Sequence, residues 1–314
     1  MSTNASVISG VATKPNPERG HRSRVLAAYF LFLTLITALT VYGFDYYTLG
    51  ANERPFSPKH SVLRPSGAIG IKLGILGVAM FLVIFLYPLR KRWPWLMRQG
   101  VSKHWLDYHV VLGVAAPFVI AFHASFKFHG FAGIAFWIML AVSGSGIIGR
   151  YLYAQIPRSL STAELSLREM QDQRQQLTDS LHGQNLISQS DLAKLLHMPS
   201  PERVKQLSMV TALGYMLALD GARIFRVAKL RRRNLGMTEN LTTLGGLRAS
   251  RNHAVERVIV AARDEAALGK RILFLSRSQQ VFHLWHVIHK PFSWSFAALA
   301  LIHIFVVINL GYRW

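Results

Sequence analysis

Four histidines, two on each of two long apolar segments, have the type and spacing to ligate metal ions. His109 and His123 share one segment and His289 and His303 share another, with 14 residues separating the members of each pair. Fourteen residues of α-helix make nearly four turns, so both imidazoles of a pair lie on one helix face, about 21 Å apart along the axis. Ionisable side chains in membrane helices are rare and usually functional, and imidazole is an axial ligand of haem iron. The spacing therefore predicts two levels of histidine ligation.

Non-covalent b-type haem is the cofactor that this ligand set favours. The chain contains no cysteine, which excludes disulfides, cysteine-ligated iron–sulfur clusters and the covalent attachment of a c-type haem. It also contains no glycine-rich dinucleotide or phosphate-binding fingerprint, so electrons would have to come from outside partners. We expect an inner haem between His109 and His289 and an outer haem between His123 and His303.

Cationic residues lie near the predicted ends of the membrane helices and could pair with haem propionates. They are Arg150, Lys290, Lys127 and Arg313. Basic side chains at such positions also serve as interfacial anchors, with their apolar stems in the membrane and their charged heads in water. The sequence favours neither interpretation over the other.

Composition places the chain among polytopic membrane proteins. Its 314 residues are 51% hydrophobic and only 16% charged, with 36 Lys and Arg against 15 Asp and Glu. The apolar run at 207–219 has only 13 residues, so we interpret it as a buried or interfacial helix and not as a span. Five other runs are long enough to cross a bilayer, which predicts an all-α, polytopic membrane helix bundle. These spans cover about residues 25–42, 68–88, 105–126, 131–153 and 282–310.

Glycines in the second predicted span indicate close helix packing. Gly70, Gly74 and Gly77 recur at a spacing that lets two membrane helices approach each other closely. Other glycines near the histidines could leave room for a flat macrocycle; they are Gly113, Gly144 and Gly146.

The basic residues of the loops predict the orientation of the spans. The N-terminal segment and the 89–104 loop hold nine Lys and Arg, whereas the 44–67 loop, Lys127 and Arg313 give five on the other side. The richer side is expected to be cytoplasmic. The chain would then be an integral protein of a bacterial cytoplasmic (inner) membrane, N-in and C-out. The third and fifth spans would run in the same direction, which brings the two histidine pairs level.

Between the fourth and fifth spans the sequence predicts a helical cytoplasmic insertion. Ser161 and Glu164 form a capping box, and apolar residues then recur at three- and four-residue spacing. Such an insertion could dock a redox partner subunit. The chain thus divides into a cytoplasmic basic N-terminus (1–24), transmembrane helices one to four (25–153), the cytoplasmic insertion (154–280) and the fifth transmembrane helix with a short outer tail (281–314).

Residues 226–233 form a basic cluster within this insertion. A cytoplasmic cluster of this kind is attracted to the anionic leaflet of a lipid bilayer by about 1 kcal/mol per charge near the surface. The sequence holds no nucleic-acid recognition module, and basic flanks are ordinary in membrane proteins. We therefore expect contact with the bilayer and no binding of nucleic acid.

The pattern of two histidine-bearing spans resembles the transmembrane di-haem module of the ferric reductase and NADPH oxidase superfamily, a cytochrome b/b6-like arrangement. Each of the two spans carries His-x13-His, and a glycine-containing span separates them. The resemblance covers about residues 68–153 and 281–311, and it implies the four histidines as axial ligands of two b haems. The chain departs from a complete ferric reductase because it has no flavin or nicotinamide domain and because it carries the long insertion at 154–280.

We expect a di-haem b-type membrane cytochrome subunit that carries electrons between a cytoplasmic or quinone partner and an acceptor at the outer face. A quinone-linked oxidoreductase would add a site near the inner haem that involves His104, Asp107 or Arg150. The alternative is a non-redox membrane scaffold or a divalent-metal transporter with histidine ligands. Zinc and nickel sites prefer clustered nitrogen and oxygen ligands, whereas these spans offer two separated histidine levels.

Overall fold

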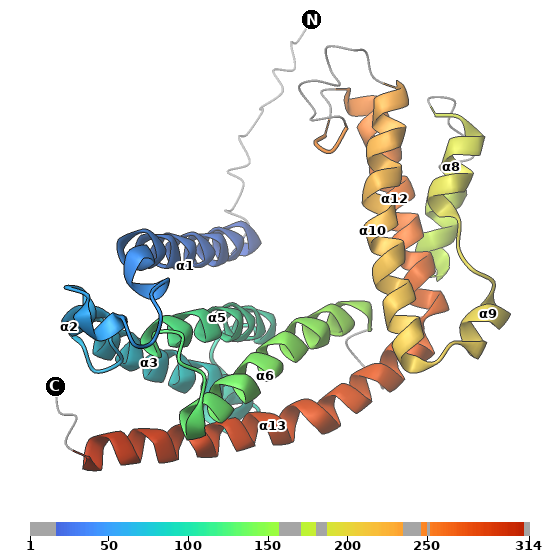
Figure 1. Cartoon of the computed structure of the whole chain (residues 1–314). Helices are drawn as coiled ribbons and strands as arrows, with labels where there is room; N and C mark the ends of the chain where they lie inside the picture. The colour runs from blue at the N-terminus through green and yellow to red at the C-terminus, as the bar shows by residue number, and fades with distance from the viewer. Residues whose placement is uncertain (1–16, 157–170, 180–186, 235–245, 250–251, 311–314) are drawn as a thin grey trace, which may run out of the picture. The chain divides into compact units, whose positions relative to one another are not determined.

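The computed structural model describes residues 17–156, 171–179, 187–234, 246–249 and 252–310 (Figure 1). Within these ranges every regular element is a helix, which confirms the predicted all-α fold. The long helices are α1 (Pro17–Tyr47), α3 (Ala68–Arg90), α5 (Ser102–His123), α6 (Gly130–Gln155), α10 (Met209–Asn234), α12 (His253–Leu273) and α13 (Leu275–Asn309). The short ones are η1 (Arg54–Phe56), α2 (His60–Leu63), α4 (Pro94–Met97), α8 (Gln189–Leu196) and α9 (Pro201–Gln206). The predicted capping box at Ser161 and Glu164 lies outside the described residues.

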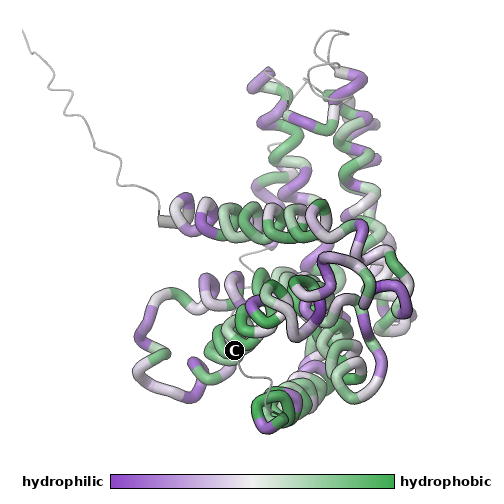
Figure 2. The backbone as a smooth tube through the Cα atoms, turned by 60° about the vertical axis from the view of Figure 1, so that its left-hand side comes forward, coloured by the Kyte–Doolittle hydropathy of each residue, from purple (hydrophilic) through white to green (hydrophobic). Residues whose placement is uncertain are grey.

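Five helical segments of the described chain are long and apolar enough to cross a membrane. They match the five predicted spans in number and position, although most extend further at one or both ends. Figure 2 shows hydrophobic residues running along these helices. The chain is accordingly an integral membrane protein, with candidate spans at Arg19–Tyr47, His60–Arg90, Ser102–His123, Gly130–Gln155 and Leu275–Asn309.

The apolar run at 207–219 is not one of these candidate spans, as predicted, but its helix does not stop at Asp220. α10 continues past Asp220, and its carboxylate is paired with side chains of the same unit. Its Oδ2 accepts hydrogen bonds from the Tyr151 hydroxyl at 2.7 Å and from the Lys270 ammonium at 2.5 Å. Burial lowers the pKa of Lys270, and the bond to Asp220 opposes that shift. The run is therefore the first half of a longer helix.

The residues form two compact units, the first made of 1–147 and 289–314 and the second of 148–288. In the first unit α5 packs most extensively against α3 and next against α1. The buried core of this unit consists of Leu39, Leu73, Met80, Ala115, Ala116, Val119, Ala121, Phe122, Phe136 and Met139.

Two of the three predicted packing glycines, Gly74 and Gly77, lie where α3 approaches α5, whereas Gly70 lies against the backbone of Arg64 and Pro65. A Cβ atom built on Gly77 would lie 2.4 Å from Cδ1 of Ile120, and one built on Gly74 would lie 2.8 Å from Cε1 of His123. Side chains at these positions would force the helices apart, since small residues are what allow such an approach. The tight contact positions α5 against α3 along most of its length.

Within the first unit, the part of α13 that follows His289 contacts α3 through large aromatic rings. Phe296 packs edge-on against Phe81 with 5.8 Å between ring centroids, and Trp294 packs against Phe85 at 5.6 Å. Between residues 289 and 309 of this helix only Ala297 is fully buried. Much of this part of α13 therefore remains available for contacts other than direct helix packing.

A buried guanidinium fixes the loop that joins α3 to α5. Arg90, 7% exposed, ends α3. It donates hydrogen bonds to the hydroxyl of Ser102 at 2.7 Å and to the carbonyls of Met97 at 3.0 Å and Gly100 at 2.9 Å. The start of α5, which carries His109, is thereby tied to the end of α3.

Replacing Arg90 by methionine should lower the free energy of unfolding by about 2–3 kcal/mol, because three acceptors lose a charged donor. Methionine keeps most of the apolar stem, so lost packing contributes little. Arg92→Met removes the same charge from an exposed neighbouring position and should cost less than about 0.5 kcal/mol. Equilibrium unfolding in detergent measures both variants, and equal losses would show that Arg90 has no special role.

A second buried arginine acts at the other end of the α3 and α5 pair. Arg54 donates hydrogen bonds to the carbonyl oxygens of Tyr47, Leu49 and Ser125. Ser125 and Phe126 have positive φ values of 49° and 58°, a backbone conformation that cannot continue a right-handed helix. The chain therefore leaves α5 immediately after His123.

The second unit has its own hydrophobic core around α8, α10 and α12. Its buried apolar residues include Ile187, Leu192, Leu195, Val227, Leu230, Val255, Ile259 and Ala262. Arg231 of the 226–233 cluster is buried there, where its guanidinium donates to both carboxylate oxygens of Glu256 at 2.8 Å. Part of the basic cluster is therefore used inside the fold.

Candidate functional site

The first unit contains all four histidines that the sequence predicts as ligands. His109 and His123 lie on α5, and His289 and His303 lie on α13. Each is half-buried, so part of every imidazole is enclosed by protein while part remains accessible. Their usefulness as ligands depends on which ring nitrogen carries the proton.

The two histidines of α5 both point a ring nitrogen at a backbone carbonyl of α3. Nδ1 of His109 lies 3.0 Å from the carbonyl oxygen of Ile84, and Nδ1 of His123 lies 2.8 Å from that of Gly70. These acceptors are also 14 residues apart, so the antiparallel α3 repeats the spacing of the histidines. One helix thus supplies the same type of hydrogen-bond acceptor to both imidazoles.

Local sequence explains why these two carbonyls can accept an imidazole. In an α-helix the carbonyl of Ile84 would bond to the N–H of residue 88, but Pro88 has none. The carbonyl of Gly70 is approached across Gly74, where any side chain would collide with the His123 ring. A proline and a glycine therefore open the two acceptor positions in different ways.

His289 has a side-chain partner from α6. Its Nδ1 lies 2.7 Å from Oγ of Ser145. The same hydroxyl donates to the carbonyl of Val142 at 2.8 Å, so its proton is already committed. Because a hydroxyl has only one proton, donation to Val142 assigns Nδ1 of His289 as the donor to Ser145.

Three of the four histidines therefore share one tautomer. A carbonyl oxygen can only accept, which requires a proton on Nδ1 of His109 and His123, and the same holds for His289. In a neutral imidazole the lone pair is then on Nε2. This state suits metal ligation, since histidine ligands usually donate the opposite N–H to a protein acceptor.

The pairing of His123 with His303 stays a prediction. His109 and His289 are each held by a different helix, through Ile84 on α3 and Ser145 on α6. The pairing of His109 with His289 stays a prediction.

The cationic residues predicted as propionate partners lie at different places. Lys127 is exposed in the turn that follows α5, and Lys290 is exposed on α13 beside His289. Arg150 is half-buried and belongs to the second unit, and Arg313 lies outside the described residues. Their roles toward a haem stay predictions.

The donor set and the space around it fit a haem. Of the three glycines predicted to leave room, a Cβ atom built on Gly113 or Gly144 would meet no atom within 4 Å, whereas one on Gly146 would lie 3.9 Å from Cε1 of His289. Across the described ranges there is no group of three or more His, Cys, Asp or Glu that could hold a metal ion. Separate imidazoles with open space beside them suit a haem, because its macrocycle supplies the remaining ligands of the iron.

Sequence reasoning named His104 and Asp107 at the start of α5 but missed the buried residue that joins them, His21. His21 of α1 is 4% exposed, and its Nε2 lies 2.9 Å from Oδ2 of Asp107. Its ring stacks on His104 with 3.6 Å between centroids and lies edge-on to Tyr108 at 5.5 Å. The signal that could have found it is Asp107 itself, because a carboxylate at the start of an apolar helix requires a partner.

Comparison with known proteins gives no relative for this arrangement. No protein-family model, no curated protein and no solved structure matches the chain. The chemistry of the site must therefore be inferred from its own residues.

Proposed function

We propose that the chain is a di-haem b-type membrane cytochrome subunit that carries electrons across the membrane. His109 and His289 would hold the inner haem, and His123 and His303 the outer one. The observation that carries this proposal is the shared tautomer of three of these histidines. Hydrogen bonds from Nδ1 to fixed acceptors leave the lone pair on Nε2, the nitrogen that would ligate the iron.

The residues of the chain would orient the ligands and tune them. Hydrogen bonds to Ile84, Gly70 and Ser145 hold each ring in one orientation and make the imidazole a stronger electron donor. The bound haems supply the one-electron redox chemistry. Lys127 and Lys290 would stay near the membrane surfaces, where an ammonium can pair with a propionate.

The proposal also covers the setting of the protein. It agrees with the resemblance to the transmembrane module of the ferric reductase and NADPH oxidase superfamily, because both rely on His-x13-His in two spans. We place the chain in a bacterial cytoplasmic membrane, N-in and C-out, with redox partner subunits at the cytoplasmic and outer faces. The segment 154–280 would dock the cytoplasmic partner.

Haem content of the intact protein tests the proposal directly. Detergent-purified protein should show a reduced-minus-oxidised spectrum of b type, and pyridine haemochrome analysis should give two haems per chain. Protein that binds no haem when the cofactor is supplied would overturn the proposal. Metal analysis of such haem-free protein would then test the alternative of a divalent-metal transporter, for which clustered ligands are the usual requirement.

A quinone-linked activity is a second candidate function, favoured by the cluster of His21, His104 and Asp107. Buried imidazole and carboxylate groups can hydrogen-bond the oxygens of a quinone and relay its protons. Haem reduction by a quinol in proteoliposomes should slow about 100-fold in His104→Ala, with both haems retained. His129→Ala, an exposed histidine beyond α5, serves as the control. An unchanged rate in His104→Ala would assign another entry point for electrons.

A further inference from the structure

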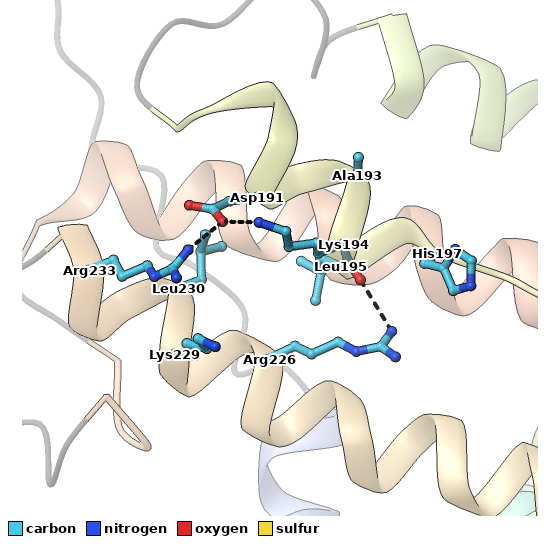
Figure 3. A pocket seen from close by; sticks show the side chains of 9 residues that line it. All are labelled: Asp191, Ala193, Lys194, Leu195, His197, Arg226, Lys229, Leu230 and Arg233. Carbon is cyan, nitrogen blue, oxygen red and sulfur yellow. Dashed lines mark hydrogen bonds and ion pairs between the residues drawn. The ribbon is translucent and has the colours of Figure 1, made fainter.

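A cavity of about 560 Å³ lies between α8 and α10 in the second unit (Figure 3). Its floor is apolar, because Leu195 of α8 and Leu230 of α10 are 3% and 4% exposed and belong to the core of the unit. Cationic side chains surround this floor. The cavity therefore combines an apolar base with a charged rim.

The charges of the rim are strongly unbalanced. Arg226, Lys229 and Arg233 recur at three- and four-residue spacing, which places them on one face of α10, and Lys194 faces them from α8. The single carboxylate of the lining is Asp191, which accepts from Arg233 at 2.8 Å and from Lys194 at 3.4 Å. Two of the four cations of the rim thus pair with this carboxylate. Like charges gathered in this way repel one another unless an anion joins them.

One of these cations is held at the rim by the backbone. Arg226 donates from Nη1 to the carbonyl oxygen of Lys194 at 3.2 Å, and this bond links α10 to the end of α8. A guanidinium has five N–H donors in a rigid fork, so this bond leaves the group able to bind an oxyanion as well. Lys229 is exposed at the same rim.

We propose that this cavity binds the phosphate group of an organic phosphate. The rim carries an excess of three positive charges, which suits a multiply charged oxyanion better than a ligand with a single carboxylate. Guanidinium together with ammonium is the usual combination for binding phosphate. The volume falls within the range of about 300–1,000 Å³ found for sites of small organic ligands. The apolar floor would contact the organic part. Both an anionic phospholipid headgroup and a soluble organic phosphate present this chemistry.

Isothermal titration of the full-length protein in an uncharged detergent tests the proposal with three probes. They are inorganic phosphate, glycerol 3-phosphate and a short-chain phosphatidylglycerol. We expect the phosphatidylglycerol to bind more tightly than inorganic phosphate, since its acyl chains can contact the apolar floor. Tighter binding of the phospholipid than of glycerol 3-phosphate would identify a lipid site, and equal binding would identify a soluble ligand. Failure of both organic probes to bind would overturn the proposal.

Matched variants separate the cavity from general charge attraction. The double substitution Arg226→Gln and Lys229→Gln should weaken binding about tenfold or more, as expected for lost hydrogen bonds from charged groups. Arg232→Gln with Arg257→Gln removes the same charge from exposed positions that do not line the cavity, and should leave affinity unchanged. Equal losses in both double variants would overturn the proposal. Lys229→Glu provides an exposed single substitution if the first variant fails to fold. None of these measurements depends on haem.

Discussion

His109→Ala should reduce the haem content of the purified protein from two b haems per chain to one. The substitution removes an imidazole whose tautomer is fixed by the carbonyl of Ile84. The haem proposed between His123 and His303 should remain, because those side chains lie about four helical turns away. Pyridine haemochrome analysis measures the stoichiometry, and a redox titration should show one of the two midpoint potentials missing.

His303→Ala should give the complementary result, with the other haem lost and the inner one retained. Two control variants remove histidines that are exposed and have no partner 14 residues away. They are His129→Ala near α5 and His283→Ala on α13, and both should keep two haems. Loss of both haems from either ligand variant would argue against two independent sites. Retention of both haems would assign the ligation to other residues.

Gly74→Ala should disturb the outer haem selectively. The new Cβ atom would lie 2.8 Å from Cε1 of His123, so the ring would have to turn away from the carbonyl of Gly70. Loss of such an outer hydrogen bond typically weakens metal binding about 10- to 100-fold. Haem titration of the apoprotein measures the change. The matched control is Gly214→Ala in α10, where an added Cβ meets no atom within 4 Å.

Pro88→Ala should affect the inner haem, and its effect should be smaller than that of Gly74→Ala on the outer haem. Alanine restores an N–H at position 88, which can then bond to the carbonyl of Ile84 and compete with His109. A weaker hydrogen bond from Nδ1 makes the imidazole a poorer electron donor to the iron. Ferric iron is then less stabilised, and the midpoint potential of the inner haem rises. We expect the midpoint potential to rise by less than about 59 mV. That is the shift produced when the ratio of the affinities for ferric and ferrous iron changes tenfold in a one-electron couple. Leu89→Ala, on the same turn, should not move the potential.

The spans and the histidine faces could be predicted from the sequence because they depend on local periodicity. Apolar runs of membrane-spanning length are visible without knowing what each helix touches. The same holds for His-x13-His, since the pitch of an α-helix fixes which side chains share a face. Gly77 was also informative, because small residues at helix contacts indicate close packing before the partner, Ile120, is known.

The partners of the histidines could not be predicted in this way. Backbone carbonyls carry no residue type, so nothing at Ile84 or Gly70 marks them as acceptors for an imidazole. Pro88 is visible in the sequence, but its effect on Ile84 matters only because α5 presents His109 there. The pairing of His21 with Asp107 likewise joins residues 86 positions apart. Such pairings follow from tertiary structure alone.

Placing both acceptors on the main chain of α3 changes what kind of mutation can damage the site. Substitutions of exposed residues between Gly70 and Ile84 leave the carbonyls where they are, whereas Gly74 and Gly77 must stay small. One inserted or deleted residue would turn the two carbonyls about 100° relative to each other. Only one histidine could then keep its acceptor. The number of residues between the two acceptors is therefore as important to the site as the side chains that α3 carries.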